Sequence, residues 1–495
     1  MAIANLPTFS DGEVLTAAKL NSLVAAIQAK HNGATGPEDM PWPLTAQGNI
    51  DMADYEIDNL PVLWNVYNLA ERPSSKTVQD VLDDIDAAGG GVAYIPADTT
   101  ISADNLDLHP NTRLLGANFS SVLAAPATPT GPLLNVASPS DADIVVENLQ
   151  LDGTSVSSGS HAGLELGQAN GFKVLHVKFA GFQGPQLYVT NDGTAGNNSQ
   201  SVRVMHCQFT QPGANVEQMQ FDDVDDMLVF DCDFDDPTQR SIYSLTTNAS
   251  QVVREVKIKE NRFKCDLSNG EGVIEVDGGF APSATASPTV RRHVHVDDNK
   301  INGSAAAVGG PAIAFKHFAV FSANRNEIRD YNRDGIAIGT NGSHVVLGSR
   351  VSEPCYTYSV SGNEMHEIGH IAIVICSPTG RGKINDNIIN ESSALDATTY
   401  HSIEFWNVTS TEDFRGTVVV GNVARNNNAA ASPSLGGAVT YQGFGPGSTA
   451  GANIGGGASG GNFLMAGNDL EGWDVGANDW TPGAARRVVD GGNNF

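Results

Sequence analysis

Residues 299–328 read NKINGSAAAVGGPAIAFKHFAVFSANRNEI and contain two motifs that recur along the chain. The first motif is a small residue or Asn, then a variable residue, then an apolar one, and it starts at Asn299 and again at Asn326. The second, IAFK at 313–316, alternates apolar and polar side chains, as does a strand with one buried face. Such recurrence predicts a solenoid, because a single unit cannot bury its apolar face alone.

Both motifs form ladders that run through most of the chain. The first ladder, with steps of 24 to 46 residues, starts at Leu149, Val177, Cys207, Cys232, Asn261, Asn299, Asn326, Asn363, Asn387, Asn422 and Asn468. The second ladder lies between these positions and starts at Leu164, Leu187, Met219, Ile242, Ile274, Ile313, Ile336, Ile371, Ile403 and Val439. We expect the Asn ladder to be structural, since Asn tolerates the left-handed backbone conformation and stacked amides bond to one another at coil corners.

The composition of the 495 residues favours an all-β protein with few helices. There are 53 Gly residues and only 17% charged residues, whereas helical proteins are rich in Lys, Glu, Ala and Leu. One helix is expected from Val78, Val81, Leu82 and Ile85, ending at the Gly run 89–91. Its single apolar face fits a cap over the first coil of the solenoid.

The charge and the cysteines exclude several classes of protein. The net charge of −28 argues against nucleic-acid binding, because phosphate backbones attract basic surfaces. Five widely spaced Cys residues argue against a disulfide scaffold. The sequence has no run of 18 apolar residues, which predicts no membrane insertion, and its N-terminus does not read as a cleaved signal.

Three segments of the sequence resemble parts of bacteriophage tailspikes. FSDGEVLTAAKLNSLVAAI, within residues 1–40, resembles the virion-attachment segment of phage tail proteins, and GNIDMADYEIDNLP, within 41–75, is similar to their collar. Residues 76–475 resemble the right-handed parallel β-helix of the pectate-lyase-like kind, preceded by the cap helix. The C-terminal tail, 476–495, departs from many family members because it is too short for a distinct trimerisation domain.

The resemblance implies a function and a set of partners. Tailspikes are homotrimers that bind, and often cut, a bacterial surface polysaccharide such as capsule, O-antigen or exopolysaccharide. Residues 1–40 would contact the phage tail or baseplate, and the protein would be made in the host cytoplasm and carried on the virion. No cofactor is expected. A secreted pectinase-type enzyme is disfavoured by the phage-like first 60 residues.

The outward residues of the second ladder contain the candidate catalytic pair, Glu275 and Asp277, in the stretch GVIEVDGG. Glycoside hydrolysis needs two carboxyl groups, one of them with a raised pKa. We expect Glu275, between Tyr243 and Ala314 on the neighbouring strands, to be the proton donor, because an apolar setting keeps a carboxyl protonated. Asp277, close to Lys316, should stay ionised and activate water.

Other outward residues are candidates for the same site. Asp222 lies two strands from Asp277, about 9.6 Å away, so these two carboxyls also suit an inverting mechanism. Substrate contacts are expected from Gln220, Tyr243, Lys316, Glu404 and Trp406, the last as a platform for sugar stacking.

Alternative roles for this surface remain open. Outward acids on a chain with 56 of them also occur as plain solvated surface, and an outward Trp also occurs beneath a loop or another subunit. A lyase would use Lys316 or Tyr243 to abstract a proton, and a non-enzymatic receptor-binding spike would use the same groove.

Three further patterns receive structural explanations. The Asp-rich stretch 222–236 fits turn-forming residues at coil corners better than a Ca²⁺ site, because no calcium-binding spacing is present. Cys207 and Cys232 occupy equivalent ladder positions, where a bridge is conceivable and buried free thiols are favoured. His293 and His295 alternate like strand residues without a third metal ligand, so no metal is expected.

Overall fold

A computed structural model describes residues 66–136, 140–141, 143–167, 169–190, 199–213, 216–222, 224, 226–245, 255–265, 272–277, 293–303, 309–316, 320–339, 357–376, 381–392, 402–406, 417–425, 439–442, 462–466, 468 and 487–491. The predicted attachment segment 1–40 and the predicted collar up to residue 65 lie outside these residues, as does the tail 476–495 apart from 487–491. All of the fold described below belongs to the part predicted to be β-helical and to its immediate flanks.

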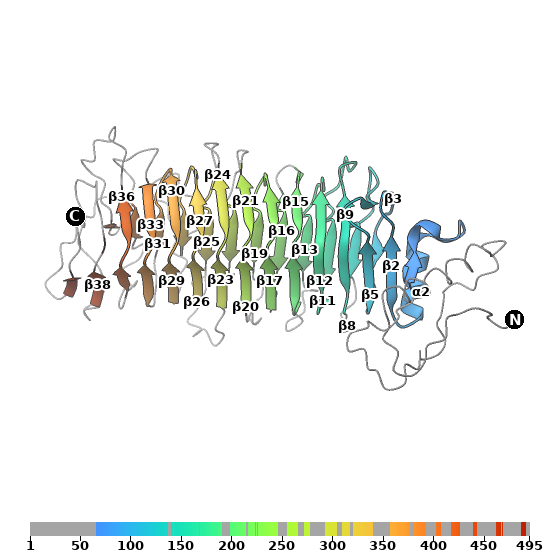
Figure 1. Ribbon diagram of the computed structural model, residues 1–495, viewed down its shortest axis with the longest axis horizontal. Helices are drawn as coiled ribbons and strands as arrows, with labels where there is room; N and C mark the ends of the chain where they lie inside the picture. Colours follow the sequence, from blue (N-terminus) through green and yellow to red (C-terminus); the bar gives the residue numbers. More distant parts are fainter. Residues whose placement is uncertain are drawn as a thin grey trace, which may run out of the picture.

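The chain winds into an elongated parallel β-helix, with a helix at one end and strands stacked coil upon coil (Figure 1). One face, which we call face 1, is a sheet of twelve strands. These are β4 (Leu106–Asp107), β7 (Leu134–Val136), β10 (Leu164–Gly167), β13 (Leu187–Thr190), β16 (Met219–Asp222), β19 (Ile242–Leu245), β22 (Ile274–Asp277), β25 (Ile313–Lys316), β28 (Ile336–Ile338), β31 (Ile373–Cys376), β34 (Ile403–Trp406) and β37 (Val439–Gln442).

The other two faces form one continuous sheet of 25 strands. Face 2 consists of β1 (Val66–Asn68), β2 (Gly91–Ile95), β5 (Thr112–Gly116), the first parts of β9 (Val145–Asp152) and β12 (Lys173–Ala180), β14 (Val202–Met205), β17 (Asp226–Phe230), β20 (Glu255–Lys259), β23 (His293–Asp297), β26 (Val320–Asn324), β29 (Thr357–Ser361), β32 (Gly382–Asn385), β35 (Val418–Val420), β38 (Asn462–Ala466) and β39 (Arg487–Gly491). Face 3 consists of β3 (Thr99–Ser102), β6 (Ser121–Ala124), the second parts of β9 and β12, β15 (Gln208–Thr210), β18 (Asp233–Asp235), β21 (Arg262–Cys265), β24 (Lys300–Gly303), β27 (Glu327–Arg329), β30 (Glu364–Ile368), β33 (Ile388–Ser392) and β36 (Val423–Arg425). A further pair, β8 (Ser140–Asp141) with β11 (Ala169–Asn170), lies outside the two large sheets. The predicted fold class, an all-β right-handed parallel β-helix, is confirmed.

Alternation of buried and outward side chains explains why these segments form strands. On β17 every second residue is buried, and the same pattern holds on β5, β14 and β20. On face 1 a column of fully buried isoleucines runs up the core: Ile242, Ile274, Ile313, Ile336, Ile373 and Ile403. On face 3 the rings of Phe179, Phe209, Phe234 and Phe263 stack with centroids 4.7 to 4.8 Å apart. The core is therefore a set of identical side chains in register.

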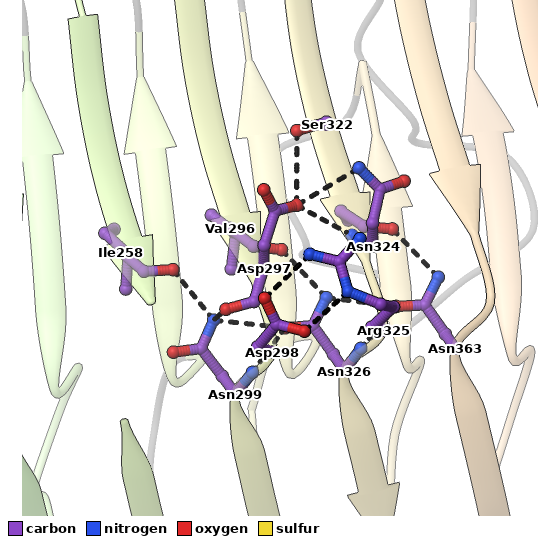
Figure 2. Close-up of polar contacts among 11 residues, drawn as sticks. Ile258, Val296, Asp297, Asp298, Asn299, Ser322, Asn324, Arg325, Asn326 and Asn363 are labelled. Atoms are coloured by element: carbon purple, nitrogen blue, oxygen red, sulfur yellow. Dashed lines mark hydrogen bonds and ion pairs between the residues drawn. The ribbon is translucent and has the colours of Figure 1, made fainter. Parts of the chain in front are cut away.

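The Asn ladder lies at the corner between faces 2 and 3 (Figure 2). The side-chain amide of Asn299 donates to Asn326 at 3.0 Å, and that of Asn326 donates to Asn363 at 3.0 Å. Each Asn also accepts the backbone N–H of the Asn in the preceding coil. The predicted structural role is confirmed, but the backbone reason is wrong. The left-handed residue is the one before the Asn, as at Asp298 and Arg325, which form an ion pair with each other.

Helix α2 (Val78–Ala87) covers the first coil, as predicted. Its buried residues are Val78, Val81, Leu82 and Ile85, and the Thr77 side chain accepts the Asp80 N–H in a capping box. A short 3-10 helix, η2 (Leu69–Glu71), links β1 to this cap. Within the described ranges no helix is long and apolar enough to cross a membrane.

Candidate functional site

The parallel register of face 1 places the candidate carboxyl residues on neighbouring strands. Glu275 on β22 aligns with Tyr243 on β19 and with Ala314 on β25. Asp277 aligns with Lys316. The neighbours predicted for Glu275 and Asp277 are therefore confirmed, which puts both residues in the middle of the sheet.

Glu275 is held by an arginine, so the predicted apolar setting is wrong. Its side chain accepts a hydrogen bond from Arg240 Nε at 2.8 Å, and only 4% of the residue is exposed. Arg240 also donates to Glu217 at 3.0 Å, and its guanidinium lies 4.4 Å from the centroid of the Tyr243 ring. Arg240 thus links Glu275 to Glu217, and this contact with a cation is not the apolar setting that was expected for a proton donor.

Asp222, at the end of β16, is the second carboxyl with defined contacts. It is 9% exposed and accepts a hydrogen bond from the Tyr188 hydroxyl at 2.7 Å. Gln220 Nε2 lies 3.4 Å from both of its carboxyl oxygens. Burial of Tyr188, together with its bond to Asp222, raises the pKa of Tyr188 to about 12. Tyr188 therefore remains a hydrogen-bond donor at neutral pH.

Glu165, on β10, lies on the other side of Tyr188. Glu165 and Tyr188 are aligned in adjacent strands, and Tyr188 is aligned with Gln220 on β16. Burial raises the pKa of Glu165, and the nearby His161 lowers it to a smaller extent. Glu165 was not among the site residues predicted from the sequence, although its strand starts at the ladder position Leu164.

The remaining predicted residues have a defined backbone position only. Asp277 and Lys316 are aligned on β22 and β25, and Glu404 and Trp406 lie on β34, but these four side chains lie outside the described part of the chain. One predicted register is wrong, since β31 begins at Ile373 and not at Ile371. All residues of the stretch 371–375 are apolar and Ile recurs at every second position, so the sequence alone offers two equivalent starting points.

Arg240 and Glu217 were missed because they precede the strands. Each lies two residues before the first strand residue, Arg240 before β19 and Glu217 before β16. They are therefore neighbours across adjacent coils, as are the backbone groups of Gln218 and Arg240, which are bonded at 3.1 Å. Arg240 and Glu217 carry opposite charges, and each lies two residues before a start of the second ladder, at Ile242 and Met219. This shared position in neighbouring coils could have revealed the pair.

The other sequence patterns have structural roles. Asp231 and Asp236 adopt positive φ, which confirms the prediction of turn-forming Asp at coil corners. Cys207 and Cys232 are buried free thiols, as favoured. Burial lowers the pKa of His295, whose Nδ1 lies 2.8 Å from the Ser322 hydroxyl. In the portion of the chain that the structure describes, no group of three or more His, Cys, Asp or Glu residues is placed to hold a metal ion.

Comparisons with known proteins identify the fold. No model of a protein family matches the sequence, and no curated protein matches it. Among solved structures, a tailspike protein mutant of E. coli bacteriophage HK620 in complex with a hexasaccharide aligns with a TM-score of 0.52 at 12% identity, over 83% of this chain and 75% of that chain. A second mutant of the same tailspike aligns with a TM-score of 0.50 at 11% identity, over 83% of this chain and 76% of that chain.

A third similar structure is the A-module of an Azotobacter vinelandii mannuronan C-5 epimerase. It aligns with a TM-score of 0.48 at 13% identity, over 83% of this chain and 94% of that chain. At such low sequence identities, structural similarity shows a shared fold and nothing about function. The predicted resemblance to the β-helix of tailspikes is confirmed at the level of the fold.

Proposed function

We propose that this chain is a tailspike-like protein that binds a bacterial surface polysaccharide on face 1 and hydrolyses it. The observation that carries the proposal is the row of carboxyl and phenol groups across β10 to β22. In this row the Tyr188 hydroxyl donates a hydrogen bond to Asp222, and Arg240 donates one to Glu275. Fixed, partly buried polar groups on a regular sheet suit recognition of a repeating polymer. The likeness to a tailspike with a bound hexasaccharide supports the same type of ligand.

Glu165 and Asp222 are the pair that best fits acid–base hydrolysis. Their strands lie two spacings apart and Asp222 lies two residues further along its strand than the residue aligned with Glu165, so the two backbones are about 12 Å apart. The two side chains would have to lean toward each other to bring the carboxyls into the 6.5 to 9.5 Å range of inverting enzymes. Glu165, whose pKa is raised, gives its proton to the glycosidic oxygen as the C–O bond breaks. Asp222 takes a proton from the water that attacks the anomeric carbon. Tyr188 lies between them and holds Asp222 in place.

The pair predicted from the sequence, Glu275 and Asp277, is the alternative. In that pair Glu275, which is bonded to Arg240, would position the sugar, and the proton would come from another group. Gln220, Tyr243, Lys316, Glu404 and Trp406 are proposed substrate contacts in either case. Gln220 lies on β16, Tyr243 and Lys316 lie on the two strands next to β22, and Glu404 and Trp406 lie further along face 1.

We also propose that the protein attaches to the phage tail and assembles from three chains. Residues 1–40 would contact the phage tail, and three chains would form the spike on the virion. The resemblance of the first 75 residues to phage tail proteins supports both statements.

The test uses the full-length protein and a panel of purified capsular and O-antigen polysaccharides. New reducing ends on one member would support hydrolysis. Absorbance of unsaturated uronate in the products would indicate a lyase and contradict the proposed mechanism. Binding without any product would indicate a receptor-binding spike that is not an enzyme.

A further inference from the structure

The strands of face 1 present many acids and few bases. From β10 to β37 their charged residues are five acids and one lysine: Glu165, Asp222, Glu275, Asp277, Glu404 and Lys316. The three whose side chains the structure describes, Glu165, Asp222 and Glu275, alternate with the buried residues Leu166, Phe221 and Val276. A ligand lying on this face meets an excess of negative charge.

The arginine at the centre of the site does not offset this excess. Arg240 bonds Glu217 and Glu275 at 3.0 and 2.8 Å, and its side chain is only 14% exposed. Its guanidinium also covers one side of the Tyr243 ring. With two carboxylates already bonded, Arg240 has little capacity left for an anionic group of a ligand.

Basic residues concentrate on another face. On face 2 the strands β12, β14 and β20 carry Lys173, Arg203, Lys257 and Lys259, of which Arg203 is paired with Asp226 and Lys257 with Glu255 on the same face. The two long faces therefore differ in charge although the whole chain carries −28.

We infer that face 1 takes a polysaccharide whose contacted residues are neutral sugars, such as hexoses, deoxyhexoses or N-acetylated amino sugars. The inference rests on the proposed function, because it names the substrate class of that site. A uronate or other acidic sugar on face 1 would place its carboxylate next to those of Asp222 and Glu275, where like charges repel. Elimination beside a uronate would also require a free cation or hydrogen-bond donor aimed at the uronate carboxylate.

The experiment compares acidic polysaccharides with their own neutral derivatives. Each uronate-containing polymer of the panel is treated with carbodiimide and borohydride, which converts the uronates to hexoses and keeps the backbone. Binding to immobilised polymer and release of reducing ends are measured for both forms and for polymers that are neutral by nature. We expect cleavage only of neutral forms, and binding at least about tenfold tighter to a reduced form than to its acidic parent.

A variant of the arginine's partner gives a second readout. Glu217→Gln frees one side of Arg240, so binding to the acidic parents should rise about threefold or more, while binding to neutral forms stays unchanged. Asp235→Asn, on face 3 and paired with Lys264 at 3.5 Å, is the matched control and should change neither.

The outcomes separate this inference from the proposed hydrolysis. If no polymer is cleaved, hydrolysis fails as a proposal, and binding alone then decides the substrate class. Tighter binding to the acidic parents overturns the inference, and so does the absence of binding to every neutral polymer. Cleavage of an acidic parent faster than its reduced form overturns the inference and leaves hydrolysis standing.

Discussion

Arg240 is the residue that organises the centre of face 1. It comes from the turn before β19 and reaches Glu217 in the preceding coil and Glu275 in the following one. The exposed fractions of these side chains are 14% for Arg240, 14% for Glu217 and 5% for Glu275. Three adjacent coils are thus tied by one guanidinium, at the place where the site is proposed.

Replacing this arginine should cost considerable stability. Arg240→Leu leaves two largely buried carboxylates without their cation, and we expect the free energy of unfolding to fall by about 3 kcal/mol. Urea unfolding followed by circular dichroism measures this change. The matched control is Arg262→Leu, whose side chain is 54% exposed while paired with Asp231 and Asp233, and this should cost less than about 1 kcal/mol. Equal losses in the two variants would contradict a central role for Arg240.

Glu165 should determine the alkaline limit of activity. Its pKa is raised above 4.5 by burial, so a proton donor at this position is lost only as the pH rises through that raised value. The same sign applies to stability. The protonated form is favoured in the folded state, so the contribution of Glu165 is present at low pH and is lost as the pH rises through its folded pKa. Glu165→Gln should abolish the alkaline limb of the pH profile together with most of the activity. An unchanged limb would assign the proton donor elsewhere.

At the scale of elements, the Asn ladder fixes the corner between faces 2 and 3. Asn326 accepts from the backbone and side chain of Asn299 and donates to Asn363 and to the Val296 carbonyl, as Figure 2 shows. These groups are buried, so their hydrogen bonds cannot be replaced by water. The ladder therefore links consecutive coils through the protein interior.

Removing one member should destabilise the stack. Asn326→Ala removes the acceptor of the Asn299 N–H and one of the donors to the side-chain oxygen of Asn363, and we expect a loss of about 2 to 4 kcal/mol in the free energy of unfolding. Asn390→Ala, at a half-buried outward position of β33, is the control and should cost less than about 1 kcal/mol. A similar effect of both substitutions would show that the ladder adds nothing beyond ordinary polar contacts.

The cap helix offers a parallel test of packing. Ile85 of α2 is fully buried against the first coil, so Ile85→Ala should cost about 2 to 5 kcal/mol. Asp86→Ala on the same helix, at an exposed position, serves as the control. A negligible loss for Ile85→Ala would mean that the first coil does not depend on its cap.

Strands and coils were predictable from the sequence because their signal is repetitive. Buried isoleucines recur at the starts of β19, β22, β25 and β28, and period-2 alternation shows which residues point outward. The register failed at β31, where Ile recurs at every second position through 371–375 and only hydrogen bonding to the next coil selects Ile373. The local sequence pattern therefore predicts that a strand is present, and the pairing of that strand with neighbouring coils determines its register.

The candidate site was predictable only in part. The sequence placed Glu275 beside Tyr243 and Asp277 beside Lys316, since these relations follow from the register. It could not show that Arg240 reaches Glu275, because the arginine lies before a strand and its direction depends on the turn. The role of a carboxyl depends on such contacts and on its burial, so the roles of Glu275 and Glu165 had to come from the structure.

At the scale of the whole molecule, the proposal of a trimeric spike predicts a particle of three chains of 51.9 kDa each. Because every chain carries −28, the copies repel one another, and the trimer should be more stable in about 0.3 M salt than at low ionic strength. Sedimentation equilibrium at several salt concentrations measures both properties. A single-chain mass at all concentrations would contradict the assembly.

The central claim is that the outward side of face 1 cleaves a polysaccharide with Glu165 and Asp222. The direct measurement is the rate of reducing-end release by the wild type and by Glu165→Gln, Asp222→Asn and the control Asp235→Asn, each first shown to be folded and to bind the polymer. The account predicts losses of about a hundredfold or more for the first two variants and full activity for the control. Full activity of both Glu165→Gln and Asp222→Asn would contradict it.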